Sequence, residues 1–292
     1  MRRNTEPKKL SRIVVTHAVD HLITHRNRAF RVAEPGRDRN RNERESRGDP
    51  DETKTRDERD AFPVNLLSST SPRAVSQAIA EARKLEGEDS RFTIHHSPFG
   101  CMDTVLGPLG VRPSGVFLDL GISSPQFDDA SRGFRPEQDG PLDLRFDVTR
   151  GEPASAFLRR VDRDELVRII EEYGETTDPI AARRVADAVV LAREEGTLPS
   201  TTKAFAALVA AAKGKEYQAM HPAKLTFQAL RIHLNQEFDE MRRGMRAAVE
   251  VMGDGGRLGV LTVRRSAFRT RAAAVFDFTA FSREVWISRR LR

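Results

Sequence analysis

The chain has 292 residues, 38% of them hydrophobic, which is enough to bury one sizeable core or a core with a smaller satellite domain. Its single cysteine, Cys101, excludes an intramolecular disulfide and a cysteine-based zinc cluster, and no apolar run is long enough to predict a transmembrane helix. The net charge is +6, and arginine supplies most of the positive side chains, which would suit a polyanionic partner. A solvated charged surface explains this composition equally well.

The N-terminal region is basic and then densely charged. Its first 33 residues carry eight Lys or Arg around the apolar run IVVTHAVDHLI, which fits either an organelle transit peptide or a basic first helix. Residues 37–60 hold seventeen charged residues in twenty-four and no large apolar side chain, so they cannot offset the entropy of ordering. We expect residues 1–61 to be a basic N-terminus followed by a disordered linker.

From residue 62 apolar segments alternate with helical patterns. The expected elements run strand, helix, strand, helix, strand, at 62–67, 71–85, 91–99, 102–110 and 115–122. Such alternation argues for an open, largely parallel α/β sheet, in which ligands bind beyond the carboxyl ends of the strands. Asp119 and the Ser-Ser-Pro-Gln that follows it occupy that position.

The middle of the chain changes to helical patterns. Three amphipathic helices, with acidic or hydroxyl caps before them and glycine after them, are expected at 162–174, 178–196 and 201–214. Residues 225–252 then carry the apolar stripe of one long helix, followed by buried strands at 253–263 and within 275–292. The predicted division is a first part of the α/β core at 62–127, a helical insert at 128–220, and a second part of the core at 221–292.

An acid followed by Ser-Ser-Pro at a strand end resembles the motif with which amino-group methyltransferases hold an exocyclic amine beside a methyl donor. The amine of cytosine is a poor nucleophile because its lone pair is delocalised into the ring. Acceptors that bind the amine protons localise this lone pair while the methyl group transfers. An ordinary strand-to-loop turn capped by Asp119 is the structural alternative for this fragment.

Four segments together resemble the small-subunit ribosomal RNA cytosine-N4 methyltransferases, the MraW/RsmH family. They are GVFLDLGISSPQFDDASRGFRPEQDGPLDLRFD, EYGE, HPAKLTFQALRIHLNQEF and GDGGRLGVLTV, in this order, within a similarity that covers about residues 71–263. The resemblance implies a Rossmann-like methyltransferase core with an inserted helical subdomain, S-adenosylmethionine as donor and a cytidine of small-subunit ribosomal RNA as acceptor. Neither a membrane nor a metal is implied.

The resemblance also implies roles for individual residues. Catalytic roles fall to Asp119, Ser123, Ser124 and Pro125. Cofactor contacts fall to Phe99, Asp119, Gln126 and Ser69, with core packing as the alternative for Phe99. RNA contacts fall to Arg145, Arg183, Arg184, His221 and Arg231. Helix-surface roles remain the alternative for the helical arginines, and Asp139, Asp143 and Arg145 could either order their loop or face the substrate.

Three cofactor-side features of the family are missing. The Gly-Gly-His loop is absent where the charged tract 37–60 stands, LLSSTSP replaces the ribose-binding acid, and TVRRSAFRTR replaces a Ser-Phe-His-Ser segment. Three interpretations therefore stay open. The chain is an active enzyme with an unusual donor pocket, or a silent relative that binds ribosomal RNA as an assembly factor, or the product of a wrongly predicted gene start. We expect a mitochondrial or plastid location, with a bacterial cytoplasm as the alternative.

Overall fold

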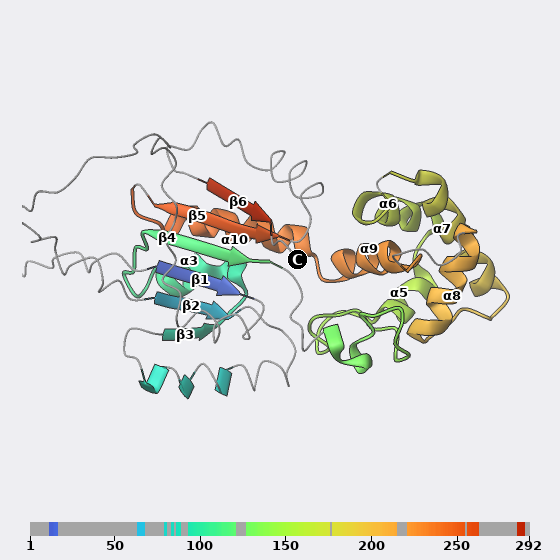
Figure 1. Ribbon diagram of the computed structural model, residues 1–292, viewed down its shortest axis with the longest axis horizontal. Helices are drawn as coiled ribbons and strands as arrows, with labels where there is room; N and C mark the ends of the chain where they lie inside the picture. The colour runs from blue at the N-terminus through green and yellow to red at the C-terminus, as the bar shows by residue number, and fades with distance from the viewer. Residues whose placement is uncertain are drawn as a thin grey trace, which may run out of the picture.

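The computed structural model describes the chain in several stretches, namely residues 12–16, 63–67, 79–80, 83–84, 86–88, 93–120, 127–175, 177–214, 221–254, 256–262 and 285–289. These residues form two lobes. One is a parallel sheet with helices packed on it, and the other is helical (Figure 1). Helices α9 (Lys224–Leu234) and α10 (Glu237–Val251) join the two lobes. Within the described residues, none of the helices has the length and apolar character that crossing a membrane requires.

Six strands form one sheet in the order β3-β2-β1-β4-β5-β6, and all neighbouring strands are parallel. Their bounds are Arg12–Thr16 (β1), Pro63–Leu67 (β2), Thr93–His96 (β3), Gly115–Asp119 (β4), Arg257–Thr262 (β5) and Val285–Arg289 (β6). This is the order of a doubly wound α/β sheet, in which ligands bind at the carboxyl edge where the strand order reverses. The reversal lies between β1 and β4.

Strand β1 corrects the expectation for the N-terminal region. Residues 12–16 form neither a basic helix nor a segment outside the fold, because they pair with β2 on one side and β4 on the other. Five residues are too few to separate the strand period from the helix period, so pairing with the neighbouring strands decides the conformation. The sheet therefore begins before residue 62, whereas the expected linker at 37–60 lies outside the described residues.

The sheet lobe has its own core, which packs helices α3 (Met102–Leu106) and α10 (Glu237–Val251) on the strands. Its buried side chains come from β4 and β5 on one side and from the two helices on the other: Val116, Leu118, Leu258, Val260, Met102, Leu106, Met241 and Met245. A Cβ atom on Gly244 would overlap the ring of Phe99, so glycine lets α10 lie directly on the 3-10 turn η3 (Phe99–Cys101).

The helical lobe contains the three predicted helices and three further elements. Its helices are α5 (Ala154–Arg160), α6 (Arg163–Tyr173), α7 (Pro179–Glu194), α8 (Thr202–Lys213) and α9 (Lys224–Leu234), with the 3-10 turn η4 (Ala130–Arg132) before them. Asp162 and Asp178 cap α6 and α7 by accepting hydrogen bonds from the backbone of Asp164 and Ala181. Helix α5 was not predicted, because seven residues give only two turns of helical pattern.

The single helix expected at 225–252 is wrong, because the structure divides it into α9 and α10 at Asn235 and Gln236. The apolar stripe continues across the break but serves two cores. Phe227 and Leu230 belong to the core of the helical lobe, and Met241 belongs to that of the sheet lobe. No glycine or proline marks the break in the sequence, and by packing α9 belongs with the helices rather than with the second part of the sheet.

Candidate functional site

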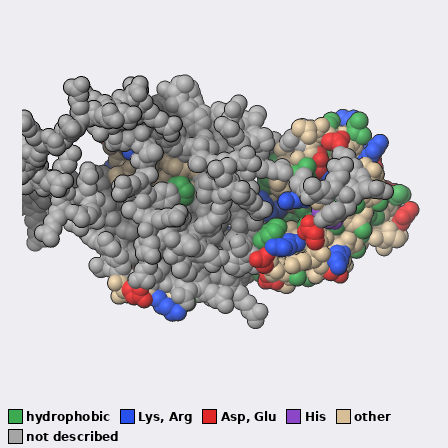
Figure 2. All heavy atoms as spheres, in the orientation of Figure 1, with side chains coloured by type: hydrophobic (Ala, Val, Ile, Leu, Met, Phe, Trp, Pro, Cys, Tyr) green, Lys and Arg blue, Asp and Glu red, His purple; other side chains and the backbone are tan. Residues whose placement is uncertain are grey.

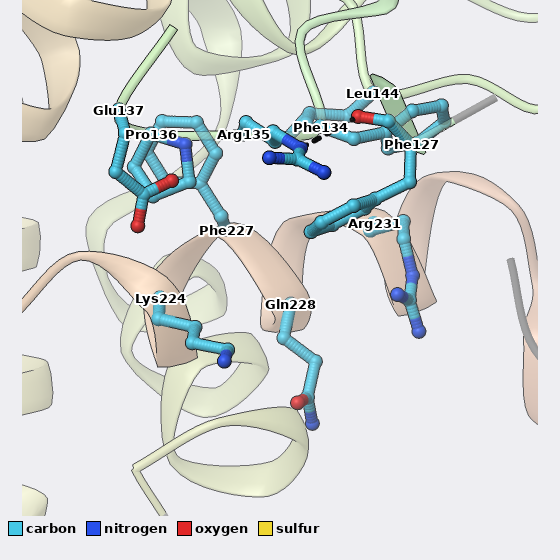
Figure 3. A pocket seen from close by; sticks show the side chains of 10 residues that line it. All are labelled: Phe127, Phe134, Arg135, Pro136, Glu137, Leu144, Lys224, Phe227, Gln228 and Arg231. Carbon is cyan, nitrogen blue, oxygen red and sulfur yellow. Dashed lines mark hydrogen bonds between the residues drawn. The ribbon is translucent and has the colours of Figure 1, made fainter. Parts of the chain in front are cut away.

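A pocket of about 230 Å³ lies in the helical lobe between the irregular segment 127–144 and helix α9 (Figure 3). It combines aromatic rings, three cationic side chains, an amide and an acid. The lining residues are Phe127, Phe134, Arg135, Pro136, Glu137, Leu144, Lys224, Phe227, Gln228 and Arg231. Rings can stack on a planar base and guanidinium groups can bind phosphate, so this lining suits a nucleotide.

One wall of the pocket is a face of α9. Lys224, Gln228 and Arg231 are spaced by four and three residues, which places them on the same side of the helix, and Figure 3 shows them projecting from it side by side. Gln228 Nε2 donates to the carbonyl oxygen of Tyr173 at 3.1 Å, which fixes the direction of the amide. Lys224 is exposed at the start of the helix.

The opposite wall is organised by Arg135. Its guanidinium lies 4.6 Å from the centroid of the Phe127 ring, and its Nε donates to the Phe127 carbonyl oxygen at 3.2 Å. A salt bridge to Asp128 completes this set. Arg135 therefore fixes Phe127 in the pocket wall, with the guanidinium of Arg135 stacked on the face of the Phe127 ring.

Arg145 orders the loop from which it comes. It forms two hydrogen bonds with the carboxylate of Asp143, at 2.8 and 2.7 Å, and donates to the carbonyl oxygens of Val148, Arg150 and Gly151. The hydrogen bond that Arg145 donates to Asp143 raises the pKa of Arg145 above its ordinary value. Of the two roles left open by the sequence, this geometry favours loop ordering, since the donors of Arg145 are used within the loop.

Two neighbouring residues support the same loop. Arg132 is 6% exposed and donates from Nη2 to the carbonyl oxygens of Arg145 and Phe146, and its burial lowers its pKa. Asp139 accepts a hydrogen bond from the backbone N–H of Lys203 at 3.3 Å, at the start of α8. The polar residues of the DGPLDLR segment thus act mainly on the backbone around the pocket.

Asp119 ends β4 at the carboxyl edge of the sheet. Its backbone pairs with Thr16 of β1 and Leu261 of β5, so it lies at the point where the strand order reverses. The chain that leaves this edge reaches Phe127 of the pocket wall only eight residues later. The segment between them contains Ser123, Ser124, Pro125 and Gln126, which, like Ser69, lie outside the described residues.

Phe99 lies inside the sheet lobe. It is 2% exposed and its ring packs on Gly244 of α10. This position agrees with core packing, the structural alternative to a cofactor contact. The backbone N–H of the next residue, Gly100, donates to Glu240 Oε1 at 2.9 Å. Helix α10 thereby fixes the segment that joins β3 to α3.

The other predicted RNA contacts lie away from the pocket lining. His221 Nδ1 accepts a hydrogen bond from the backbone N–H of Ala223 at 3.1 Å, just before α9. Arg183 and Arg184 are exposed on α7, with Arg183 Nε 3.9 Å from Glu171 Oε1. On the face shown in Figure 2, basic and acidic side chains are interspersed over the helical lobe. Only Arg231 of the five predicted residues lines the pocket.

Sequence reasoning missed several pocket residues. Phe127, Arg135 and Lys224 were not singled out, although all three lie in segments quoted for the family resemblance. For Lys224 a signal existed, because its spacing from Gln228 and Arg231 follows the helix period. For Phe127 and Arg135 no such period exists, since they come from irregular backbone.

The six-stranded parallel sheet and the helices packed on it define the chain as an α/β protein, with Asp119 at the edge where ligands bind in sheets of this kind. The sequence model of the MraW methylase family matches residues 71–267. The chain belongs to this family. Among similar proteins, the ribosomal RNA small subunit methyltransferase H of Cupriavidus necator is 45% identical over 188 residues, covering 63% of this chain and 55% of that protein.

Two further relatives carry the same name. The protein from Ralstonia nicotianae is 44% identical over 190 residues, covering 63% of this chain and 58% of its own length. That from Idiomarina loihiensis is 39% identical over 193 residues, covering 65% of this chain and 58% of its own length. The chain thus spans little more than half the length of the curated relatives it matches.

Proposed function

We propose that the protein transfers a methyl group from S-adenosylmethionine to the N4 amine of a cytidine in small-subunit ribosomal RNA. The observation that carries this proposal is the pocket of rings, cations and an amide a few residues along the chain from the acid at the switch point of the sheet. Membership of the MraW methylase family and the names of the relatives support it. In this proposal the sheet lobe is a Rossmann-like core and the helical lobe, with α9 included, is its insert.

The pocket is proposed to hold the acceptor base. Stacking of a base on an aromatic side chain contributes about 1–3 kcal/mol, and Phe127 together with Arg135 provides such a surface. Lys224 stands exposed at the rim, where it can bind a neighbouring phosphate. The target cytidine has to leave its stack to enter, as base-modifying enzymes require.

The cofactor is proposed to bind at the carboxyl edge of the sheet, and the position of Asp119 supports this proposal. Asp119 ends a strand at the switch point of a doubly wound sheet, where a carboxylate can accept hydrogen bonds from a bound nucleoside. We propose Gln126 and Ser69 as further contacts. Phe99, buried under α10, supports the adjoining segment from within the core rather than offering an exposed ring face.

When bound, S-adenosylmethionine supplies an electrophilic methyl group. The proposed role of this chain is to hold and deprotonate the amine. Several acceptors are proposed to bind the amine protons. They are the carboxylate of Asp119, the hydroxyls of Ser123 and Ser124 and the backbone carbonyl before Pro125. As the methyl group passes from the donor sulfur to the amine nitrogen, the methyl–sulfur bond breaks and neutral S-adenosylhomocysteine leaves. Asp119 would take the proton that the amine then loses, so the charge on the product base is neutralised.

The proposed partner is small-subunit ribosomal RNA, free or in the small ribosomal subunit, and the reaction needs neither a metal nor a membrane. Among the described residues, no group of three or more His, Cys, Asp or Glu is placed to hold a metal ion. The named relatives are bacterial, which favours a bacterial cytoplasm over a mitochondrion or plastid.

The test is transfer of tritiated methyl from S-adenosylmethionine to small-subunit ribosomal RNA that lacks the modification. Asp119→Asn should lower the rate at least about a hundredfold, because it removes the proposed base, while the urea unfolding midpoint stays unchanged. Asp103→Asn, at a half-buried position in the first turn of α3 in the same lobe, is the matched control and should stay within about twofold of the wild type. Binding of the RNA without any transfer would instead identify a silent relative that acts in ribosome assembly.

A further inference from the structure

The two lobes have separate cores, and none of the described residues belongs to both. Of the chain connections between them, the structure describes the one from α9 to α10 (Figure 1). This connection is short, since α9 ends at Leu234 and α10 begins at Glu237. Within the part of the chain that the structure describes, contacts around residues 235–238 therefore help to fix the relative position of the lobes.

The turn at this joint is strained. Gln236 has a φ of 49°, in the left-handed region that a residue with a side chain adopts at a cost of roughly 1–3 kcal/mol. Such a conformation persists only where neighbouring contacts hold it. Asn235 provides some of them, because its Nδ2 donates to the carbonyl oxygens of Leu144 and Arg231 at 2.8 Å and its Oδ1 accepts from the backbone N–H of Phe146 at 2.5 Å.

Two side-chain contacts cross the turn. Arg231 of α9 binds Glu237 of α10 in a bidentate pair, with Nε to Oε1 at 2.6 Å and Nη2 to Oε2 at 3.0 Å. The ring of Phe238, the next residue of α10, lies 5.5 Å from that of Tyr173 in α6. Both side chains of the ion pair are 21% exposed, so water screens it less than a surface pair.

Contacts on either side of the ion pair connect the proposed acceptor pocket with the sheet lobe. Arg231 lines the acceptor pocket, whereas Glu237 does not. From Glu237, helix α10 leads to Glu240, which binds the backbone of Gly100, and to Gly244, on which Phe99 packs. A continuous set of contacts therefore runs from the pocket of the helical lobe to the segment after β3 in the sheet lobe.

We propose that Arg231 and Glu237 form a positioning pair that fixes the helical lobe on the sheet lobe, so that a base held in the pocket is aligned with the methyl donor at the Asp119 edge. The inference rests on the proposed function. Methyl transfer needs the amine and the methyl carbon in one line, and a displacement of about 1 Å can lower such a rate a hundredfold. Glu237 touches neither substrate in this account and acts only through Arg231.

The test measures the distance between the lobes directly. Cys101, the single cysteine, is exposed in the sheet lobe, and Ala207→Cys adds a second thiol on the exposed side of α8. Spin labels on both thiols report the distance distribution by pulsed electron paramagnetic resonance. We expect one narrow distribution in the parent protein and a broader one after Glu237→Gln.

Asp239→Asn is the matched control, because it removes the same charge from the same turn of α10 and its partner, Arg242, lies on that helix. It should leave the distribution unchanged. An unchanged distribution in Glu237→Gln would overturn the inference.

The second readout is the single-turnover rate of methyl transfer at saturating donor and RNA. Glu237→Gln should lower this rate by about tenfold to a hundredfold, while the affinities for S-adenosylmethionine and for cytidine stay within about twofold of the parent values. A merely structural role would lower affinity and stability together, which would contradict the proposal. If the parent protein transfers no methyl group, the proposed function fails and the distance distribution alone decides on the ion pair.

Discussion

At the scale of single residues, the most buried ionic contact in the described chain joins Lys213 and Glu175. Their side chains are 3% and 6% exposed, and Lys213 Nζ also donates to the carbonyl oxygen of Pro222 at 2.6 Å. The pair thereby links Lys213, at the end of α8, with Glu175, which follows the C-cap of α6, and with Pro222, just before α9. Removing one partner of such a pair leaves an uncompensated buried charge.

Lys213→Met should therefore lower the free energy of unfolding by about 3–5 kcal/mol, measured by urea titration. The control is Lys203→Met, in the exposed first turn of the same helix, which should stay within about 0.5 kcal/mol of the wild type. Adding Glu175→Gln to Lys213→Met should restore part of the loss, because it removes the unpaired charge. A loss below about 1 kcal/mol in the single variant would contradict this account of the pair.

His233 makes stability depend on pH. Burial against Phe157, whose ring centroid lies 5.0 Å away, lowers the pKa of His233 below its ordinary 6.5, an effect that Glu165 opposes and Arg168 reinforces. The unfolded chain then binds the proton more readily than the folded one, so the stability from neutral His233 is present above pH 6.5 and is lost as pH falls through the folded pKa. In urea titrations between pH 7.5 and 5, roughly one unit either side of the ordinary value, His233→Gln should lose less stability than the wild type. Parallel curves would exclude this role.

At the scale of elements, the packing of α10 on η3 depends on the missing side chain of Gly244. Alanine within a helix normally gains about 1 kcal/mol over glycine, but here the added Cβ would enter the Phe99 ring. Gly244→Ala should therefore destabilise the protein by about 1–3 kcal/mol in thermal or urea unfolding. Gly253→Ala, where no atom lies within 4 Å of the added carbon, is the control. A stabilised Gly244→Ala variant would show that α10 does not lie on Phe99.

The exposed face of α9 should carry part of the affinity for RNA. Lys224→Ala removes a cation from the pocket rim and should raise the KM for ribosomal RNA about threefold to tenfold with little change in kcat, since a phosphate contact forms before the reaction. Lys203→Ala serves as the control on α8. Equal KM values in the two variants would place the RNA elsewhere.

The elements differ in how far the sequence could predict them. Strands β3, β4, β5 and β6 and helices α3, α6, α7 and α8 follow local apolar patterns, and the structure confirms them. Strand β1 could not be recognised, because its conformation comes from pairing with strands distant in sequence. The break between α9 and α10 could not be predicted from the sequence either. It is stabilised by contacts with other parts of the fold, namely Asn235 with Phe146 and Glu237 with Arg231.

The candidate site shows the same limit. Arg231 and Gln228 could be found from a helical motif, and the pocket contains both. The contacts of Arg145 within its loop favour a loop-ordering role, and its RNA contact stays a prediction. The sequence could not decide between the two, because irregular backbone forms the environment of Arg145 and has no periodicity. Ser123, Ser124, Pro125 and Gln126 stay predictions, as they lie outside the described residues.

At the scale of the whole molecule, a parallel sheet that carries Asp119 at its carboxyl edge is joined to a helical lobe that carries the pocket proposed for the acceptor base. The two lobes keep separate cores and meet at the turn between α9 and α10 (Figure 1). In the proposed function one lobe binds the donor and the other the acceptor, and the alignment of the two lobes is then expected to determine the rate.

The most direct test identifies the product. Small-subunit ribosomal RNA without the modification is incubated with the purified chain and S-adenosylmethionine, digested to nucleosides and examined by mass spectrometry. We predict N4-methylcytidine that appears with the wild type and disappears with Asp119→Asn. A methyl group on a ring carbon or on a ribose hydroxyl, or no methylated nucleoside at all, would contradict the assignment of the amine as the acceptor.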